Sequence, residues 1–515
     1  MLFFIGNFML SPSYLDSLPD SFVKLFQEVE EQILRDVARR IGKMDALTPT
    51  ANWQLWRYQQ TEAVRKDVVK LLARYTGKSE AEIRRLMKEA ATAALEAEAE
   101  IYYHYGKEPT PFEESAPLQN LLNAGYRQTA GSFSNLTATT ANTVSGAFEQ
   151  ALDRAWLQVS SGAFDYKTAV KRAVDGLADS MPYVTYPSGH RDTLEVACRR
   201  AVLTGVNQTG AKLQEARMDE MGASFVEVTA HGGARPSHAV WQGRRYHRGG
   251  AVDYLGQHYE DFESATGYGT GAGLCGWNCR HTFFVVFPEL GSPPAWTQES
   301  LEALNARDIE YDGRLYTRYE ISQMQRARER AVRKWKRRYL AEDAAGADTT
   351  ASAVKLRQAR QSLADFTRAT GGRVDSARTS VHGFGRSEGS KASYAVRKQE
   401  RFNAANTELQ QMREAGTIKA KGRLIESPSA PNEINFASDH VLQRWAERGM
   451  GPMDAERIIR SSKVAMSQRN GTQTCYYSEL GFVAIGQDGN VSSIGPLDEG
   501  GKKLMEVVKK HGIPH

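Results

Sequence analysis

The stretch from Glu227 to Phe287 restricts the folds open to this chain more than any other part of the sequence. It contains five of the eleven histidines, two of the four cysteines and a dense set of glycines, and it lacks helical periodicity. Such a segment has to be held by specific turns and side-chain hydrogen bonds. Runs with strand character, 225–230 and 281–287, lie at its two ends. We therefore predict an α+β central domain, with a small sheet that carries long irregular loops.

The part of the chain before this stretch has the pattern of helices. Residues 21–44 place apolar side chains three and four positions apart, which is the spacing of one buried helical stripe. We expect Gly77 to end a second helix, and Ser79 and Glu82 to form a capping box that opens the next one. The hydroxyl-rich stretch 137–145 is interpreted as a helix break or a helix–helix contact surface, because Ser and Thr side chains compete for backbone hydrogen bonds.

Composition places the chain among soluble globular proteins. Its 515 residues are enough for three or four domains, and 41% of them are hydrophobic and 25% charged. A net charge of +5 is only a weak indication of nucleic-acid binding. Four cysteines do not form a disulfide framework, so a reducing compartment is expected. Cys198 lies on an apolar stripe and is predicted to be a buried thiol.

The first ten residues are apolar but do not form a targeting signal. They carry no basic region and no cleavage site, and ten residues cannot span a bilayer. We interpret them as the result of a misplaced start codon, with Met9 as the alternative start, or as a small apolar anchor. No other stretch approaches the length of a membrane span, so we expect no membrane-spanning segment.

A basic helix is predicted over residues 315–345. Between Arg326 and Arg338 it contains eight cationic residues and one acidic residue. We interpret this run as a solvated helix face; the alternative is contact with DNA phosphates or with an acidic surface of a neighbouring subunit. From residue 346 to 398 the composition shifts towards Gly, Ser, Ala and Thr, which predicts a helix over 353–367 and then a flexible tether. A further helix over 394–415 leads into a C-terminal unit.

Two blocks of the central stretch resemble the phage minor capsid protein type 2 family. They read GARPSHAVWQGRRY (233–246) and TGYGTGAGLCGWNCRH (266–281), and the sequence upstream of the first block agrees with that family. The resemblance covers roughly residues 12–345. A more distant similarity is to the Mu F-like head morphogenesis proteins, which pair a His-containing turn with an Asn-Cys-Arg element. The motif residues are Arg235, His238, Trp241, Gly243, Asn278, Cys279, Arg280 and His281.

The resemblance implies a role in the phage head. It implies a virion component that is present in few copies near the portal, is made in the cytoplasm of a bacterial host, and acts in assembly. Portal and capsid proteins are then the expected partners, and the alternative is a head or ejection protein that contacts phage DNA through the basic helix.

Considered residue by residue, the two blocks favour a structural network without a cofactor. In that network, Arg235 and Arg280 would bridge loops, Asn278 would fix a turn, and Trp241 and Trp277 would pack over the strands. The alternative is a metal site, with zinc as one candidate ion. The ligands to suspect for it are Cys275, Cys279, His281 and His238.

Spacing argues against chemistry in these blocks. Three residues separate Cys275 from Cys279, whereas a zinc knuckle has two, and no second pair is present. A nucleophilic pair of Cys279 and His281 has no evident third group to orient it. The glycines are not followed by the lysine, hydroxyl and helix of a phosphate-binding loop.

The C-terminal unit, residues 433–515, is predicted to be a small α+β domain. Two helices precede short strands at 474–479, 481–486 and 491–495, and a final helix ends near residue 510. On the first helix His440, Arg444 and Arg448 share one face, because they recur every four residues. A histidine could transfer the proton of an RNA 2′-hydroxyl, and the arginines could hold the phosphate without a metal ion. Strand residues that could add hydrogen bonds are Tyr476, Tyr477, Ser492 and Ser493.

This pattern resembles the phage-borne nucleases of the barnase/EndoU/colicin/RelE superfamily. The resemblance implies a metal-independent ribonuclease toxin with RNA as substrate and an immunity protein as partner; the alternative is a non-catalytic adaptor. The sequence as a whole thus predicts a multidomain, mainly helical protein. Its expected parts are a helical N-terminal region (11–160), a helical and α+β central domain (161–296), a basic helical extension (297–345), a linker with helices (346–432) and a nuclease-like α+β domain (433–515).

Overall fold

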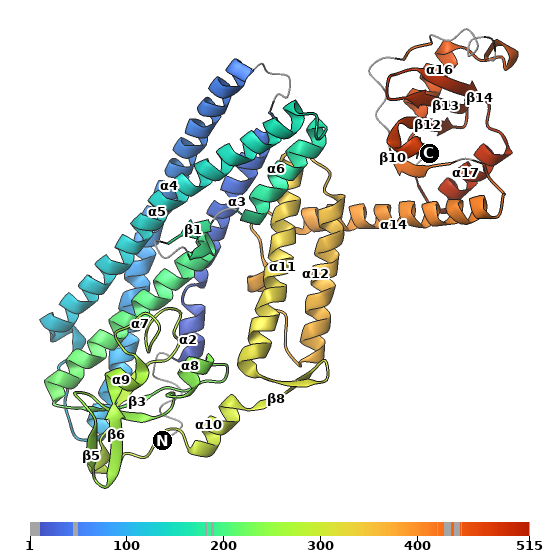
Figure 1. Ribbon diagram of the computed structural model, residues 1–515. Helices are drawn as coiled ribbons and strands as arrows, with labels where there is room; N and C mark the ends of the chain where they lie inside the picture. The colour runs from blue at the N-terminus through green and yellow to red at the C-terminus, as the bar shows by residue number, and fades with distance from the viewer. Residues whose placement is uncertain are drawn as a thin grey trace. The chain divides into compact units, whose positions relative to one another are not determined.

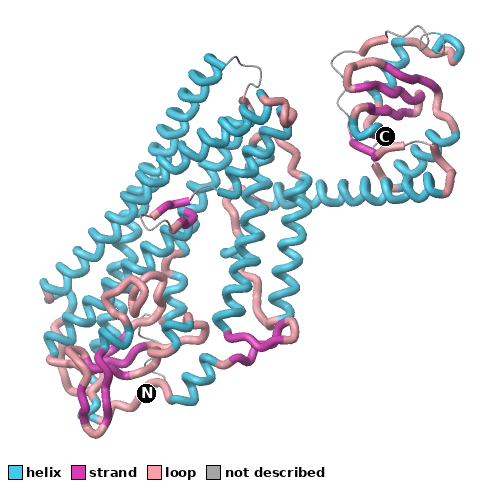
Figure 2. The backbone as a smooth tube through the Cα atoms, in the orientation of Figure 1, coloured by secondary structure: helices cyan, strands magenta, loops and turns pink. Residues whose placement is uncertain are grey.

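The computed structural model describes residues 11–44, 50–180, 183–186, 190–419, 421–426, 434–436, 443 and 445–513. The chain forms two compact units, which we call unit 1 (Met1–Arg386) and unit 2 (Ser387–His515). Helices dominate, and the strands are confined to small sheets, as Figure 2 shows. The fold class predicted from the sequence is therefore confirmed. The apolar segment 1–10 lies outside the described residues.

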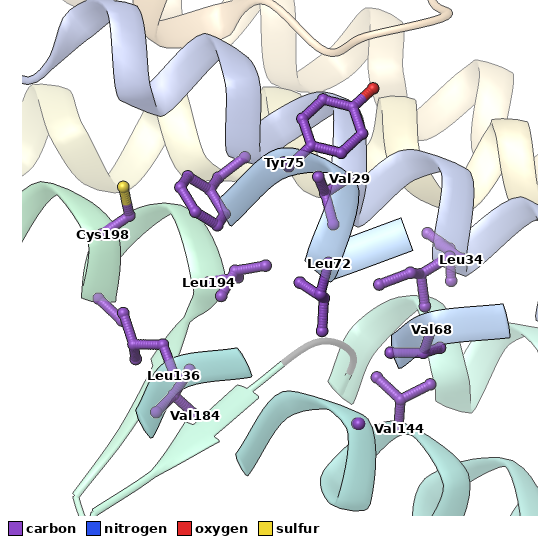
Figure 3. Close-up of a cluster of buried hydrophobic side chains, with 14 of the residues drawn as sticks. Val29, Leu34, Val68, Leu72, Tyr75, Leu136, Val144, Val184, Leu194 and Cys198 are labelled. Carbon is purple, nitrogen blue, oxygen red and sulfur yellow. The ribbon is translucent and has the colours of Figure 1, made fainter. Parts of the chain in front are cut away.

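Unit 1 is built on a pair of long helices, α4 and α5, which lie side by side (Figure 1). Helices α3, α6 and α7 pack against this pair and share one apolar core with it. Figure 3 shows part of that core, where α3, α4, α5 and α7 each contribute side chains. The helices are α2 (Pro12–Ser17), α3 (Asp20–Gly42), α4 (Thr50–His104), α5 (Ala116–Ser160), α6 (Tyr166–Ser180) and α7 (Leu194–Met221).

The helix end predicted at Gly77 is wrong, because α4 is 55 residues long and continues through this position. Buried side chains recur at helical spacing before Gly77, as at Leu72, and after it, as at Ile83. Burial of this stripe outweighs the cost of one helical glycine, which is about 1 kcal/mol. The capping box expected there is also wrong, since Glu82 lies inside the helix, where it pairs with Arg85.

The hydroxyl-rich stretch 137–145 does not break α5, which is continuous. Thr140 and Ser145 are buried in it, so the alternative interpretation, a helix–helix contact, is confirmed. Cys198 is fully buried on α7, as predicted.

The central sheet of unit 1 has the strand order β5-β6-β4-β3-β7. Helix α7 ends at Gly222, which has a positive φ of 64°, and the chain then enters β3. Strand β3 pairs antiparallel with β4 and β7, whereas β4 and β6 are parallel. The strands predicted around 225–230 and 281–287 are present. The elements are β3 (Phe225–Val228), α8 (Pro236–Ala239), β4 (Arg245–His247), β5 (Val252–Tyr254), β6 (Gln257–Asp261), α9 (Phe262–Thr266) and β7 (Phe283–Val285).

The remainder of unit 1 is a helical hairpin with small additions. Helix α11 begins with a capping box formed by Thr317 and Glu320, and α12 packs along it. The flexible tether predicted after α12 is wrong: the chain packs against α11 up to the end of unit 1, and α14 (Arg386–Glu414) begins there. Lys336 donates to the carbonyl of Thr379 over 2.6 Å, and Phe384 packs against Tyr339. The elements are β1 (Tyr183–Thr185), β2 (Arg191–Thr193), α10 (Gln298–Asn305), β8 (Arg307–Tyr311), β9 (Arg314–Thr317), α11 (Arg318–Ala344), α12 (Thr350–Ala369) and α13 (Ser376–Thr379).

Unit 2 is a five-stranded antiparallel meander, β10-β11-β12-β13-β14. Helices α14 and α17 contribute to the core on one face of it, and α16 and Trp445 to the core on the other. The three predicted strands are present, and β10 and β11 are additional strands that the sequence did not predict. The elements are α14 (Arg386–Glu414), β10 (Arg423–Glu426), α16 (Pro452–Ser461), β11 (Val464–Gln468), β12 (Gln473–Ser478), β13 (Gly481–Gly486), β14 (Val491–Gly495) and α17 (Glu499–Lys510). In neither unit is a described helix long and apolar enough to cross a membrane.

Candidate functional site

A cavity of about 930 Å³ lies in unit 1, between the helices and the loops that precede β7. Its walls come from α2, α3, α7, α8, α11 and α13. Cationic side chains outnumber carboxylates among the described residues that line it. The arginines of the lining are Arg199, Arg235, Arg280, Arg326, Arg330, Arg333 and Arg378.

Asp16 is the acidic centre of this lining. Its carboxylate lies 2.8 Å from a guanidinium nitrogen of Arg199 and 3.0 Å from one of Arg378. Burial raises the pKa of Asp16, but the neighbouring guanidiniums outweigh burial and hold the pKa below its usual value. At Arg326 the surroundings disfavour the charged form instead. Burial, and then repulsion by Arg378 and Arg280, lower its pKa to about 10. The cavity therefore has an excess of positive charge, which favours an anionic occupant.

One wall of the cavity carries a buried cluster that we call the His–Cys triad: His238, Cys279 and His281. His238 lies on α8, and the other two residues precede β7. The sulfur of Cys279 is 3.7 Å from Nδ1 of His238 and 3.6 Å from Nδ1 of His281. Each of the three residues is at most 2% exposed.

Close backbone packing brings the triad together. In the loop before β7, a Cβ atom on Gly273 would lie 1.9 Å from the carbonyl oxygen of Gly267, so this crossing requires glycine. Cys275 and Asn278 both have a positive φ, of 57° and 55°, which turns the chain sharply around Cys279. From α7, the Asn207 side chain donates to the carbonyls of Cys279 (3.0 Å) and His281 (3.1 Å) and holds the turn in place.

The second nitrogen of each triad histidine faces an oxygen acceptor. Nε2 of His238 lies 2.9 Å from the Ala272 carbonyl, and Nε2 of His281 lies 3.0 Å from Oε1 of Gln242. Burial lowers the pKa of His238 to about 4, lowers that of His281 well below its usual value, and raises the pKa of the Cys279 thiol. At neutral pH the imidazoles are therefore uncharged, and uncharged imidazoles are able to ligate a transition metal.

The other motif residues surround the triad. Trp241 packs edge-on against the His281 ring, with 4.9 Å between centroids, and Arg235 donates to the Trp277 carbonyl over 3.0 Å. Gly243 has a φ of 66°. Arg280 lies near Asp16 in the cavity, with 4.0 Å between the charged atoms.

Trp277 does not pack over the strands as predicted, and Cys275 is not among the clustered candidate ligands. Trp277 is 59% exposed and covers Gly271 instead of the strands. Cys275 turns its thiol towards the His281 carbonyl at 3.6 Å, so its sulfur is not part of the triad.

Several residues of the site did not emerge from the sequence. Gln242 and Asn207 lie within or just upstream of the recognised blocks, so their position was a usable signal. Asp16 and Arg378 come from α2 and α13, which carry no motif, and only folding brings them together.

The cations of α11 are largely neutralised inside unit 1, so the interpretation as a solvated face is wrong. Arg337 is buried and bonds Glu30 and Glu31, Arg333 bonds Glu195, and Arg338 bonds Asp175. The acidic partners belong to α3, α6 and α7 of the same chain. Arg326 and Arg330, at the start of the run, line the cavity instead.

In unit 2, the predicted catalytic residues are only partly described: His440 and Arg444 lie outside the described residues. Arg448 is exposed, and its Nη1 donates to the Ile494 carbonyl over 2.6 Å. Tyr476 is buried in the core beneath α16.

The two serines occupy the irregular part of β14. The pairing of β13 with β14 shifts at this point, and Ser493 pairs with Ala484 and is partly exposed. Ser492 donates to the Ala484 carbonyl over 3.1 Å and accepts from Gln473 over 2.6 Å. Among the described candidates, Arg448 and Ser492 are exposed and Ser493 is partly exposed, whereas Tyr476 is buried.

Comparison with protein families identifies unit 1. Residues 10–368 match the family model described as phage minor capsid protein 2, and this range includes the triad and every wall of the cavity except α13. Comparisons with curated proteins and with solved structures find no match. Because the family match extends over more than half of the sequence, this chain belongs to the phage minor capsid protein 2 family and is a structural protein of the phage head.

Proposed function

We propose that unit 1 assembles next to the portal of the phage head and contacts the portal through one end of the α4–α5 pair. Leu55 and Tyr58 on α4 and Leu157 on α5 are 59%, 65% and 61% exposed. The stacking of Trp53 on Trp156, at 6.0 Å, shows that these stretches of α4 and α5 are neighbours. A local group of exposed large apolar side chains is typical of a protein-binding surface. This group is the observation that carries the proposal.

Photo-crosslinking in assembled heads tests this placement. A photoreactive amino acid at Tyr58 is expected to form an adduct with the portal protein, identified by mass spectrometry. Tyr103, an aromatic residue near the other end of α4 that is 50% exposed, is the matched control position and is expected to give no portal adduct. Adducts of Tyr58 with other head proteins alone, or absence of the chain from purified particles, would contradict the proposal.

We also propose that unit 2 is a metal-independent ribonuclease whose site is formed by His440, Arg444 and Arg448. The exposed guanidinium of Arg448 beside β14 favours this function: its bond to the Ile494 carbonyl positions the group while using one of five N–H donors. In this mechanism, His440 transfers the proton of the 2′-hydroxyl, and the arginines bind the phosphate. Ser492 is the strand residue best exposed to assist. A cell that makes such a toxin requires an immunity partner.

Expression of residues 387–515 and of the full chain tests this activity, because unit 2 is compact and has its own cores. The wild-type forms are expected to arrest growth and to fragment cellular RNA, and His440→Ala is expected to abolish both effects. His511→Ala is the matched control, because His511 is bound to Glu408 at 2.7 Å and has no assigned role in catalysis. If wild-type unit 2 neither arrests growth nor cuts RNA, it is a non-catalytic adaptor.

A further inference from the structure

We propose that the His–Cys triad binds a divalent transition-metal ion, with zinc as the best candidate, through Nδ1 of His238, Sγ of Cys279 and Nδ1 of His281. The three atoms lie within 4.8 Å of one another and come from two separate segments. Two imidazole nitrogens and one sulfur are ligands that zinc prefers.

The hydrogen bonds of the two imidazoles determine which nitrogens are bare. Nε2 of His238 faces the Ala272 carbonyl, which can only accept, so the proton is on Nε2 and Nδ1 carries a lone pair. Nε2 of His281 faces Oε1 of Gln242, which also accepts from the His231 backbone N–H at 3.1 Å. The backbone donor identifies this atom as the amide oxygen, so Nε2 of His281 carries the proton and Nδ1 of His281 is bare as well.

Two bare nitrogens thus face one thiol in a buried site. The thiol of Cys279 has one hydrogen and can donate to only one of them, so the other lone pair is directed at sulfur without a donor from the thiol. An unsatisfied buried acceptor costs about 1–3 kcal/mol. A metal ion held by the thiolate and both nitrogens removes this conflict.

The separations fit a tetrahedral ion. With Zn–S near 2.3 Å and Zn–N near 2.0–2.1 Å, tetrahedral ligands place sulfur and nitrogen about 3.5 Å apart. The observed distances from Sγ are 3.7 Å to His238 and 3.6 Å to His281. The Ala272 carbonyl and the Gln242 amide supply the outer hydrogen bonds that orient metal-binding histidines.

The cavity supplies the fourth ligand. All three triad residues line it, and three protein ligands with one open position are typical of zinc sites that exchange a ligand. Arg235 and Arg280 line the same cavity near the triad. Their charge favours an anionic oxygen, such as that of a carboxylate or a phosphate, over a neutral ligand.

Metal analysis of the full-length protein, purified without chelators, tests the site. We expect about one equivalent of zinc per chain by mass spectrometry. X-ray absorption at the zinc edge is expected to show one sulfur near 2.3 Å and nitrogen or oxygen ligands near 2.0 Å. Cobalt added to the metal-free protein is expected to produce a thiolate charge-transfer band. Zinc without a sulfur ligand, or no zinc and no cobalt band, would overturn the proposal.

Matched variants assign the ligands. Cys279→Ser and His238→Gln are expected to lose the cobalt–thiolate band or to weaken metal binding at least tenfold. Cys275→Ser, at an equally buried cysteine of the same loop, is expected to retain both. Circular dichroism checks that each variant is folded. If a variant does not fold, the X-ray absorption spectrum of the wild type still shows whether sulfur binds the metal. Retention of the band by Cys279→Ser would show that another thiol binds the metal.

Discussion

At the residue scale, the buried carboxyl group of Glu98 on α4 makes the stability of unit 1 depend on pH. It is 1% exposed, and neither of its carboxylate oxygens accepts a hydrogen bond from a described residue. Burial raises its pKa from 4.5 to about 8, although Arg217 and Arg248 act in the opposite direction. Between these two values, the folded chain keeps a proton that the unfolded chain has released.

The free energy of unfolding should therefore fall as the pH rises from 4.5 to about 8. For one group the slope is about 1.4 kcal/mol per pH unit. Glu98→Gln cannot ionise, so we expect it to be more stable than the wild type at pH 9 and close to it at pH 4.5, as measured by urea unfolding of unit 1. Glu100→Gln, at an exposed site two residues further along α4, should show no such dependence. An equal effect of Glu98→Gln at both pH values would contradict this account.

At the element scale, α5 and α7 approach each other through two glycine–threonine pairs. A Cβ atom on Gly125 would lie 2.1 Å from Oγ1 of Thr209, and one on Gly205 would lie 2.2 Å from Oγ1 of Thr129. Each threonine hydroxyl donates to the glycine carbonyl four residues before it in its own helix. These two glycine–threonine pairs allow α7 to lie close to α5. They thereby position Asn207 of α7, which holds the turn around Cys279.

Gly205→Ala is expected to destabilise unit 1 despite the higher helix propensity of alanine. Overpacking against Thr129 costs about 1–3 kcal/mol, whereas alanine returns about 1 kcal/mol of helix propensity. Gly131→Ala on α5 is the matched control: nothing lies within 4 Å of its added methyl group, and we expect stabilisation. Chemical denaturation measures both effects. A Gly205→Ala variant as stable as Gly131→Ala would disprove the close approach.

At the scale of the whole molecule, the two units have separate cores. Among the described residues, the apolar clusters of unit 2 contain only residues from Phe402 onwards, and those of unit 1 contain none beyond Phe384. Each unit therefore has the burial that it needs to fold by itself.

Residues 387–515 are accordingly expected to unfold cooperatively as an isolated fragment, at the temperature of the corresponding transition in the full chain. Ile458→Ala, in a fully buried position of unit 2, should lower the stability of this transition alone by about 2–5 kcal/mol. Leu72→Ala should lower only the transition of unit 1. Calorimetry of the full chain measures both. A single transition that both variants shift equally would contradict the independence of the units.

Local periodicity is the part of this fold that the sequence determined by itself. The stripe at residues 21–44, the strands β3 and β7 and the later strands of unit 2 were predictable, because each depends on residues within a few positions of one another. The two motif blocks likewise identified the family without any structure. The helix end predicted at Gly77 is wrong because it was inferred from one residue, whereas the stability of α4 comes from packing along its whole length.

Only the tertiary structure decided which distant groups meet. The sequence spacing of Cys275 and Cys279 argued against a metal site, yet the fold places His238, 41 residues before Cys279, against its sulfur. It likewise directs the cations of α11 onto acidic residues of α3, α6 and α7. Such pairings depend on how helices and loops cross, and spacing along one segment contains no information about the segment that packs against it.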